Sequence, residues 1–134
     1  MKIRHIVRLI FAIIFLLGAI ANTYMGLFTA SVYETFADSS LLPLYRNVWE
    51  TLVYPNIRLF LIPVVLFELA LAWLLIKSGS YVKAGLGMAL AFMLLLVPFW
   101  WQGGVIANLL LALLLLWLLR YDYPRSIAEI LKRK

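Results

Sequence analysis

Four apolar stretches constrain the fold of this chain more than any other feature. They run over residues 6–30, 57–76, 81–101 and 103–119. A helix needs roughly 20 mostly apolar residues to cross the ~30 Å hydrocarbon layer of a membrane. A mean hydropathy of +1.00, with 66% hydrophobic residues, leaves too few polar residues to cover a water-soluble domain of 134 residues. The sequence therefore predicts an all-α fold, a four-helix transmembrane bundle over residues 1–134.

The first stretch also has features of a secretory signal, which is the alternative interpretation. Lys2, Arg4 and Arg8 precede an apolar run that reaches the small-x-small pattern Ala-Ile-Ala at residues 19–21. Apolar residues continue beyond this pattern as far as Phe28. This continuation favours an uncleaved membrane helix.

The basic residues indicate how the bundle is oriented, because Lys and Arg remain on the cytoplasmic side of short loops. In a four-pass arrangement only Arg46 and Arg58 of the 12 basic residues fall on the outer side. The others are Lys2, Arg4, Arg8, Lys77, Lys83, Arg120, Arg125, Lys132, Arg133 and Lys134. We expect a multi-pass protein of the cell (inner) membrane with both termini and the tail 120–134 in the cytoplasm. The scattered cations favour contact with lipid headgroups over nucleic acid.

The longest loop, over residues 31–56, is predicted to hold a short helix on the outer surface. Ser39 and Ser40 are residues that cap helices, and Pro43 suits a first helical turn. Apolar residues then recur at helical spacing over residues 43–53. We expect this helix to lie flat on the membrane interface over the mouth of the bundle.

Two further helix ends are indicated outside the spans. The sequence Tyr-Pro-Asn at residues 54–56 is expected to break the interfacial helix, with Asn56 capping the second span. In the tail, Ser126 and Glu129 stand at the spacing of a capping box, which predicts a short helix there.

Small residues indicate how the spans pack, since close backbone approach drives helix association in lipid. Two spans carry small or amide residues at intervals of four: Gly18, Asn22 and Gly26 in the first, and Gly104, Asn108 and Ala112 in the fourth. Residues four apart share one face of a helix. The pattern predicts close approach of the first and fourth spans at Gly18 and Gly104.

Glu68 is the one carboxylate inside an apolar run, VLFELALAW at residues 65–73. An acidic residue near mid-membrane costs about 2.5–3.5 kcal/mol on insertion scales. Arg58 lies ten residues away on the same helix, roughly 15 Å by helical rise, which is beyond direct pairing. Three roles remain open for a neutral or hydrogen-bonded Glu68: a structural hydrogen bond, ligand or proton handling, and contact with a partner subunit, including a second copy.

A polar cluster is predicted around Glu68 from the depth of the residues. At about 1.5 Å per residue, Glu68, Asn22 and Asn108 lie ~16, ~12 and ~8 Å from the outer ends of their spans. All three fall in the outer half of the membrane. The candidate ligand-binding or proton-handling residues are Glu68, Asn22, Asn108, Tyr24, Gln102 and Trp101.

The chain resembles the DoxX-like family of four-helix membrane proteins. The residues that carry the resemblance are Arg8, the run 15–18 and Asn22 in the first span, residues 42–46 with Trp49 and Pro55 in the loop, and Phe67 to Leu71 in the second span. Many members carry a Lys where this chain has Asn22 or Thr23. The resemblance implies a bundle of four helices and, in some members, association with respiratory or sulfur-related oxidoreductase assemblies.

The composition excludes several kinds of chemistry within one copy of the chain. With no Cys and one His, His5, the chain provides neither thiolate ligands for metals or iron–sulfur clusters nor a pair of imidazoles for haem. We therefore expect no metal site, no catalytic residue and no enzymatic activity of its own.

Three functional classes follow from these features. The first is an accessory or anchoring subunit of a membrane oxidoreductase assembly, as the resemblance implies. The second is a binder or carrier of a small lipophilic molecule such as a quinone, as the polar cluster under an aromatic-rich mouth suggests. The third is a small proton-coupled exporter with Glu68 as the proton carrier, although such exporters lack so strong a charge bias.

Overall fold

Helices make up almost all of the described chain, as the apolar stretches predict. The computed structural model describes residues 2–99 and 104–132, and within them no β-strand is formed. The long helices are α1 (Ile3–Phe28), α4 (Ile57–Ile76), α5 (Ser80–Leu96) and α6 (Gly104–Leu119). Helix α5 ends before Pro98, which cannot donate a backbone hydrogen bond, instead of continuing to residue 101 as expected.

Among the residues that the structure describes, two helical segments are long and apolar enough to cross a membrane. They are α1 and the continuous run Pro43–Ile76. Helices α5 and α6 are also apolar, but they contain only 17 and 16 residues.

Shorter helical elements connect α1 to α4. In chain order they are η1 (Ala30–Glu34), α2 (Thr35–Asp38), α3 (Pro43–Val48), η2 (Trp49–Val53) and η3 (Tyr54–Asn56). The helix expected over residues 43–53 is present as α3 and η2, but it does not break at residue 54. It continues through η3 into α4, because Pro55 occupies the first turn of η3, where its missing N–H costs little.

Of the expected helix caps, only the one in the tail is formed. Leu42, rather than Ser39 or Ser40, stands at the N-cap of α3, and it makes no side-chain cap hydrogen bond. Asn56 does not cap α4 with its side chain: its amide nitrogen donates instead to the carbonyl of Leu52 at 3.0 Å. Because the chain is already helical before Ile57, no free helix start exists there to be capped. Ser126 and Glu129 do form the predicted capping box, at the start of α7 (Ile127–Leu131).

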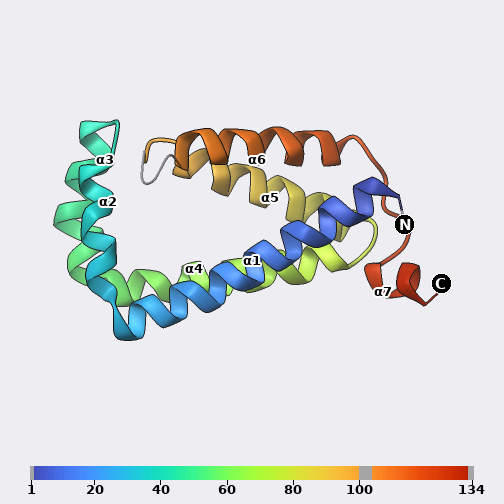
Figure 1. Cartoon of the computed structure of the whole chain (residues 1–134), viewed down its shortest axis with the longest axis horizontal. Helices are drawn as coiled ribbons and strands as arrows, with labels where there is room; N and C mark the ends of the chain where they lie inside the picture. Colours follow the sequence, from blue (N-terminus) through green and yellow to red (C-terminus); the bar gives the residue numbers. More distant parts are fainter. Residues whose placement is uncertain (1, 100–103, 133–134) are drawn as a thin grey trace.

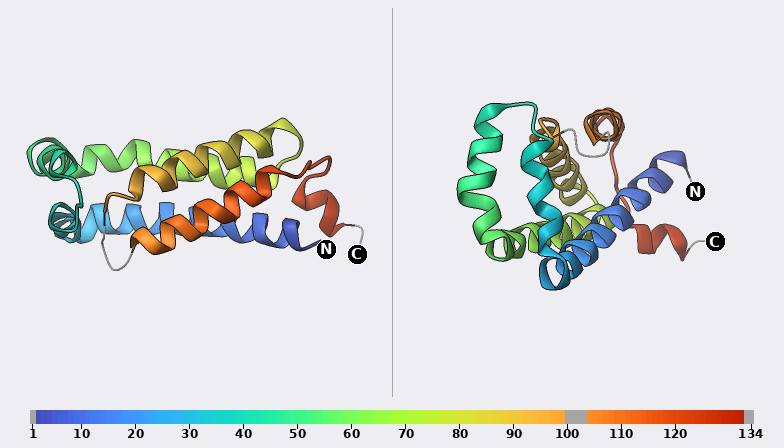
Figure 2. Two further views of the ribbon diagram at one scale, coloured as in Figure 1. Left: turned by 90° about the horizontal axis from the view of Figure 1, so that it is seen from above. Right: turned by 60° about the vertical axis from the view of Figure 1, so that its left-hand side comes forward.

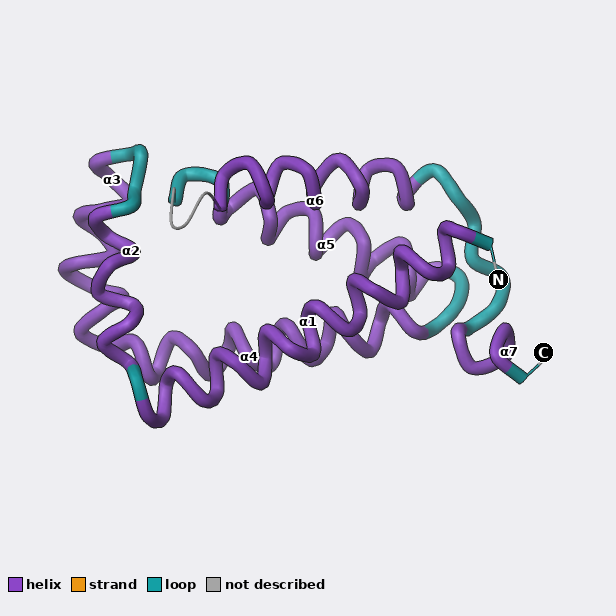
Figure 3. The backbone as a smooth tube through the Cα atoms, in the orientation of Figure 1, coloured by secondary structure: helices purple, strands orange, loops and turns teal. Residues whose placement is uncertain are grey.

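The helices form a frame that is closed at both ends (Figure 1). Helix α1 packs along α4, and α5 packs against both α4 and α6. We call the end with the chain termini and α7 the terminal end, and the end with α2 and α3 the hairpin end (Figures 1 and 2). The helices converge toward the terminal end and spread apart toward the hairpin end, where α2 and α3 cross between them (Figure 3).

The predicted partner of α1 is therefore wrong. The glycine face of α1 meets α4, not α6: a Cβ atom built at Gly26 would lie 2.7 Å from a methyl carbon of Leu61. Gly104 is less confined, since its nearest non-local neighbour would be a carbonyl oxygen at 3.6 Å, an ordinary contact distance. A stripe of small residues permits close approach but does not choose the partner helix.

The main apolar core lies toward the terminal end and joins all four long helices. Its buried members include Phe11 and Phe15 on α1, Leu71 and Leu75 on α4, Val82 and Leu86 on α5, and Leu115 and Leu118 on α6. A smaller core of Tyr33, Ile57 and Leu61 lies toward the hairpin end. Asn22 on α1 and Glu68 on α4 lie between these two cores along their helices.

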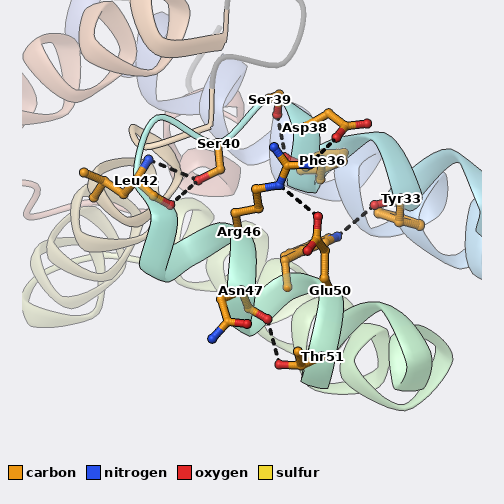
Figure 4. A network of polar contacts seen from close by, with 11 residues as sticks. Tyr33, Phe36, Asp38, Ser39, Ser40, Leu42, Arg46, Asn47, Glu50 and Thr51 are labelled. Carbon is orange, nitrogen blue, oxygen red and sulfur yellow. Dashed lines mark hydrogen bonds and ion pairs between the residues drawn. The ribbon is translucent and has the colours of Figure 1, made fainter.

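Arg46 holds the two arms of the hairpin end together. Its guanidinium forms ion pairs with Asp38 at 3.0 Å and with Glu50 at 2.9 Å, which link α2 to α3 and η2 (Figure 4). Because these side chains are exposed, water screens both ion pairs and each contributes little to the stability of the fold. The network fixes the geometry of the hairpin more than its stability.

Phe99 attaches this hairpin to the end of α5. Its ring lies 5.9 Å from that of Phe36, 5.6 Å from Tyr45 and 5.4 Å from Trp49. The backbone adds a hydrogen bond of 2.7 Å from the Leu41 N–H to the Pro98 carbonyl. Helix α5 is thereby connected to the hairpin end.

Candidate functional site

Glu68 lies inside the structure, where it bonds to an amide. Its side chain on α4 is only 6% exposed. The amide nitrogen of Asn22, on α1, donates to Oε2 of Glu68 at 2.9 Å. The structure thus brings together two of the residues that the sequence selected.

Tyr33 is the third member of this cluster, and the sequence did not single it out. Its hydroxyl donates to Oδ1 of Asn22 at 2.6 Å, so the amide is bonded at both its oxygen and its nitrogen. The indole N–H of Trp49 in turn donates to the Tyr33 carbonyl at 2.8 Å and holds η1 in place. Figure 4 shows Tyr33 beside the hairpin network.

Tyr33 keeps its proton under all ordinary conditions. Burial, followed by the charge of nearby Glu68, raises the pKa of Tyr33 to about 12. A phenol with this pKa is a hydrogen-bond donor throughout the physiological range. We call Tyr33, Asn22 and Glu68 the polar row.

Gly18 makes the room in which the Glu68 side chain lies. A Cβ atom at position 18 would be 2.7 Å from Oε1 and 3.2 Å from Cδ of Glu68. Any larger residue would have to displace the carboxyl group. The small face of α1 thus accommodates a polar group as well as close helix packing.

The remaining candidate residues do not join the polar row. Asn108 on α6 is half-buried and forms no hydrogen bond with Glu68 or Asn22 among the described residues. This follows from the packing of α1 on α4 rather than on α6. Tyr24 is exposed and packs its ring on Phe28, with centroids 5.1 Å apart. The other two candidates, Trp101 and Gln102, lie outside the described residues.

An apolar groove lies between α1 and α4, and Asn22 belongs to its wall. It has a volume of about 290 Å³. The surface that lines it is mostly apolar and includes the side chains of Leu27, Leu61 and Leu66. Arg58 is the other strongly polar residue of the wall; its Nε donates to the Gly26 carbonyl at 3.2 Å. The groove therefore combines a long apolar surface with an amide and a guanidinium.

A second hollow adjoins the groove along α1. It has a volume of about 420 Å³ and shares Thr23, Leu27 and Val65 with the groove. Like the groove, it is open to the outside of the helix pair and lined by apolar side chains. Together the two hollows suit an elongated apolar molecule lying against α1.

No protein-family model, no curated protein sequence and no solved structure matches this chain.

Proposed function

We propose that the chain is a four-helix protein of the cell (inner) membrane, with α1, α4, α5 and α6 as its spans and both termini in the cytoplasm. The apolar windows of α1 and of Pro43–Ile76 are only 28% and 22% buried. A core helix of a water-soluble protein would be mostly buried, whereas lipid covers apolar side chains without another protein layer. The basic residues, ten of 12 on one side, support the orientation.

Within this bundle, the α1–α4 groove binds a small lipophilic molecule with a carbonyl head, such as a quinone. One observation carries this proposal: the polar row reaches the wall of an apolar groove at Asn22. Ligand sites typically join apolar walls to a few oriented polar groups. The aliphatic wall suits the tail of such a molecule, and the polar groups suit its head.

The donors for a carbonyl oxygen are Asn22 and Arg58. The Asn22 amide nitrogen carries two hydrogens, of which Glu68 accepts one. The Tyr33 hydroxyl and Glu68 prevent the amide from turning, because they occupy its oxygen and its nitrogen. The second N–H is thus held in a fixed direction, which lowers the entropy cost of binding.

Electron transfer is the task of a partner in this proposal. The chain itself contains no Cys and one His, and it resembles DoxX-like proteins, some of which associate with oxidoreductase assemblies. We therefore place the chain as an accessory subunit that holds a quinone-like molecule beside a redox enzyme.

The proposal is tested by measuring quinone binding to the protein purified in neutral detergent. A decyl-substituted benzoquinone is the probe, and decylbenzene, with the same tail but no carbonyl, is the control compound. We expect saturable binding of the quinone and at least fivefold weaker binding of decylbenzene. Asn22→Leu should weaken quinone binding about fivefold, as expected for one lost hydrogen bond of about 1 kcal/mol.

Asn108→Leu is the matched control variant, because it makes the same exchange outside the polar row. It should bind the quinone as the parent does. Equal binding of quinone and decylbenzene, or equal losses in Asn22→Leu and Asn108→Leu, would contradict the proposed function.

A further inference from the structure

Positive charge gathers at the terminal end, around the start of α1. Lys2 stands at the N-cap, and Arg4, His5 and Arg8 follow in the first turns. The first turn contains no acidic residue, and no side chain caps it. Because a helix N-terminus already carries a partial positive charge, these cations raise the electrostatic energy there. A bound anion would lower it.

Arg8 is buried without the partners that its charge requires. Its side chain is fully buried, at 0% exposure, yet Nε and Nη1 have no hydrogen-bond partner in the part of the chain that the structure describes. The remaining nitrogen, Nη2, donates one long hydrogen bond of 3.5 Å to the Arg125 carbonyl. An uncompensated buried charge is strongly destabilising, so a countercharge at this position would stabilise the fold.

A cavity of about 400 Å³ lies at this end, and one of its lining residues, Arg125, accepts the Arg8 hydrogen bond through its backbone carbonyl. It is lined by Lys2, Arg4, His5, Pro124, Arg125 and Ile130, from the start of α1, the segment before α7, and α7 itself. We call it the terminal pocket. Two of its side chains also have buried atoms without partners, Nε of Arg4 and Nδ1 of His5. His5 is only 9% exposed, so water satisfies little of its ring.

Tyrosine rings position the two guanidinium groups of α1. Arg4 lies over the Tyr121 ring at 5.2 Å and Arg8 over the Tyr123 ring at 4.8 Å. Stacking on a ring occupies a face of the guanidinium plane and leaves the N–H edge for an acceptor in that plane. A phosphate group presents several such acceptor oxygens, and Arg binds it through two parallel hydrogen bonds.

The acidic side chains near this end have other partners. Glu129 on α7 belongs to the capping box with Ser126, and exposed Asp122 pairs with Lys83 at 3.6 Å. No salt bridge within the described ranges joins a carboxylate to Lys2, Arg4, Arg8 or Arg125. Within residues 2–99 and 104–132 the pocket cations thus form no salt bridge with a carboxylate, and their charge favours a bound anion.

We propose that the terminal pocket binds a phosphate group, held by Arg4, His5 and Arg125, whose negative charge compensates Arg8. The phosphate comes either from the headgroup of an anionic phospholipid or from a water-soluble phosphate. The pocket is separate from the α1–α4 groove, so this site does not depend on the function proposed above.

The test measures the unfolding temperature of the purified protein in neutral detergent while each probe is titrated. The first probe is inorganic phosphate, compared with chloride at equal ionic strength. The second is dioctanoyl phosphatidylglycerol, compared with dioctanoylglycerol, which has the same chains without the phosphate. We expect a saturable rise in unfolding temperature with at least one phosphate probe and none with its control.

Two double variants separate the pocket from general electrostatics. Arg4→Gln with Arg125→Gln removes two pocket cations and should weaken the response roughly tenfold, as expected for lost charge-assisted hydrogen bonds. Lys77→Gln with Arg120→Gln removes the same charge outside the pocket and should leave the response unchanged. Without phosphate, the unfolding temperature of Arg8→Met should be at least that of the parent, because the unpaired buried charge is gone. Phosphate should raise the unfolding temperature of this variant less than that of the parent.

The titrations either support or contradict a phosphate site in the terminal pocket. A response to phosphatidylglycerol alone supports a lipid headgroup site, and a response to inorganic phosphate supports a soluble source. The absence of a response to either probe, or equal losses in the two double variants, overturns the proposal.

Discussion

Gly18 on α1 faces the carboxyl group of Glu68 on α4 so closely that a Cβ atom at position 18 would lie 2.7 Å from Oε1. We therefore expect Gly18→Ala to displace Glu68 from Asn22 and to lower the free energy of unfolding by about 1–3 kcal/mol, the usual cost of overpacking. Gly87→Ala is the control, because nothing lies within 4 Å of its built Cβ atom. Chemical unfolding in detergent measures both. A Gly18→Ala protein as stable as the control would show that Glu68 moves aside freely.

Two substitutions of Glu68 test how much its hydrogen bond with Asn22 stabilises the fold. Glu68→Gln keeps an oxygen for the Asn22 amide to donate to, so we expect stability within about 1 kcal/mol of the parent. Glu68→Leu leaves that donor without its partner, which should cost roughly 1–3 kcal/mol. Unfolding in detergent distinguishes the two. If Leu is tolerated as well as Gln, the polar row contributes nothing to stability.

We expect the free energy of unfolding to fall at high pH because of Tyr33. Burial and then the charge of Glu68 raise the pKa of Tyr33 from 10.0 to about 12. Its stabilising contribution is complete below pH 10 and is lost as the pH rises through 12. Tyr33→Phe should therefore lower stability at pH 7 by roughly 1 kcal/mol and lose less stability than the parent between pH 10 and 12. Tyr24→Phe, which changes an exposed tyrosine, is the control: its stability should match that of the parent at pH 7 and change by the same amount between pH 10 and 12.

The proposed orientation is tested by labelling single cysteines in intact cells. The chain has no Cys, so each introduced cysteine is unique. The side chain of Asp38 is 72% exposed, and its ion pair with Arg46 is a weak surface contact, which makes Asp38→Cys a mild change. We expect an impermeant thiol reagent to label residue 38 from outside, while tags at either terminus are reached only after the membrane is opened. Labelling of residue 38 from the cytoplasm alone would refute the four-pass arrangement.

Hydrophobic length was enough to predict most of the helices. Residues 57–76 were predicted as a span and form α4 with the same ends, and α6 begins one residue after its predicted start. The capping box at Ser126 was also predictable, because its two hydrogen bonds are local. Properties that depend on a few neighbouring residues can be read directly from the chain.

Helix pairing and the third member of the polar row could not be predicted in the same way. The small residues of α1 match those of α6, yet α1 packs along α4. Tyr33 reaches Asn22 because the chain turns back after α1, which no periodic pattern indicates. Arg8 was treated as an orientation charge like its neighbours, although it is fully buried. The sequence does contain one indication that Arg8 is buried: it stands four residues after Arg4, inside an apolar run.

The ring of Phe99, together with the Leu41–Pro98 hydrogen bond, couples the motions of the helices at the hairpin end. The helix pair of α1 and α4 and the pair of α5 and α6 share a core at the terminal end, while at the hairpin end they meet through Phe99 and its ring contacts with Phe36 and Trp49. With this contact in place, bending of one pair is transmitted to the other. Without this contact, the two helix pairs would be joined mainly through their shared core near the terminal end. The distance between them at the hairpin end would then vary with their thermal motion.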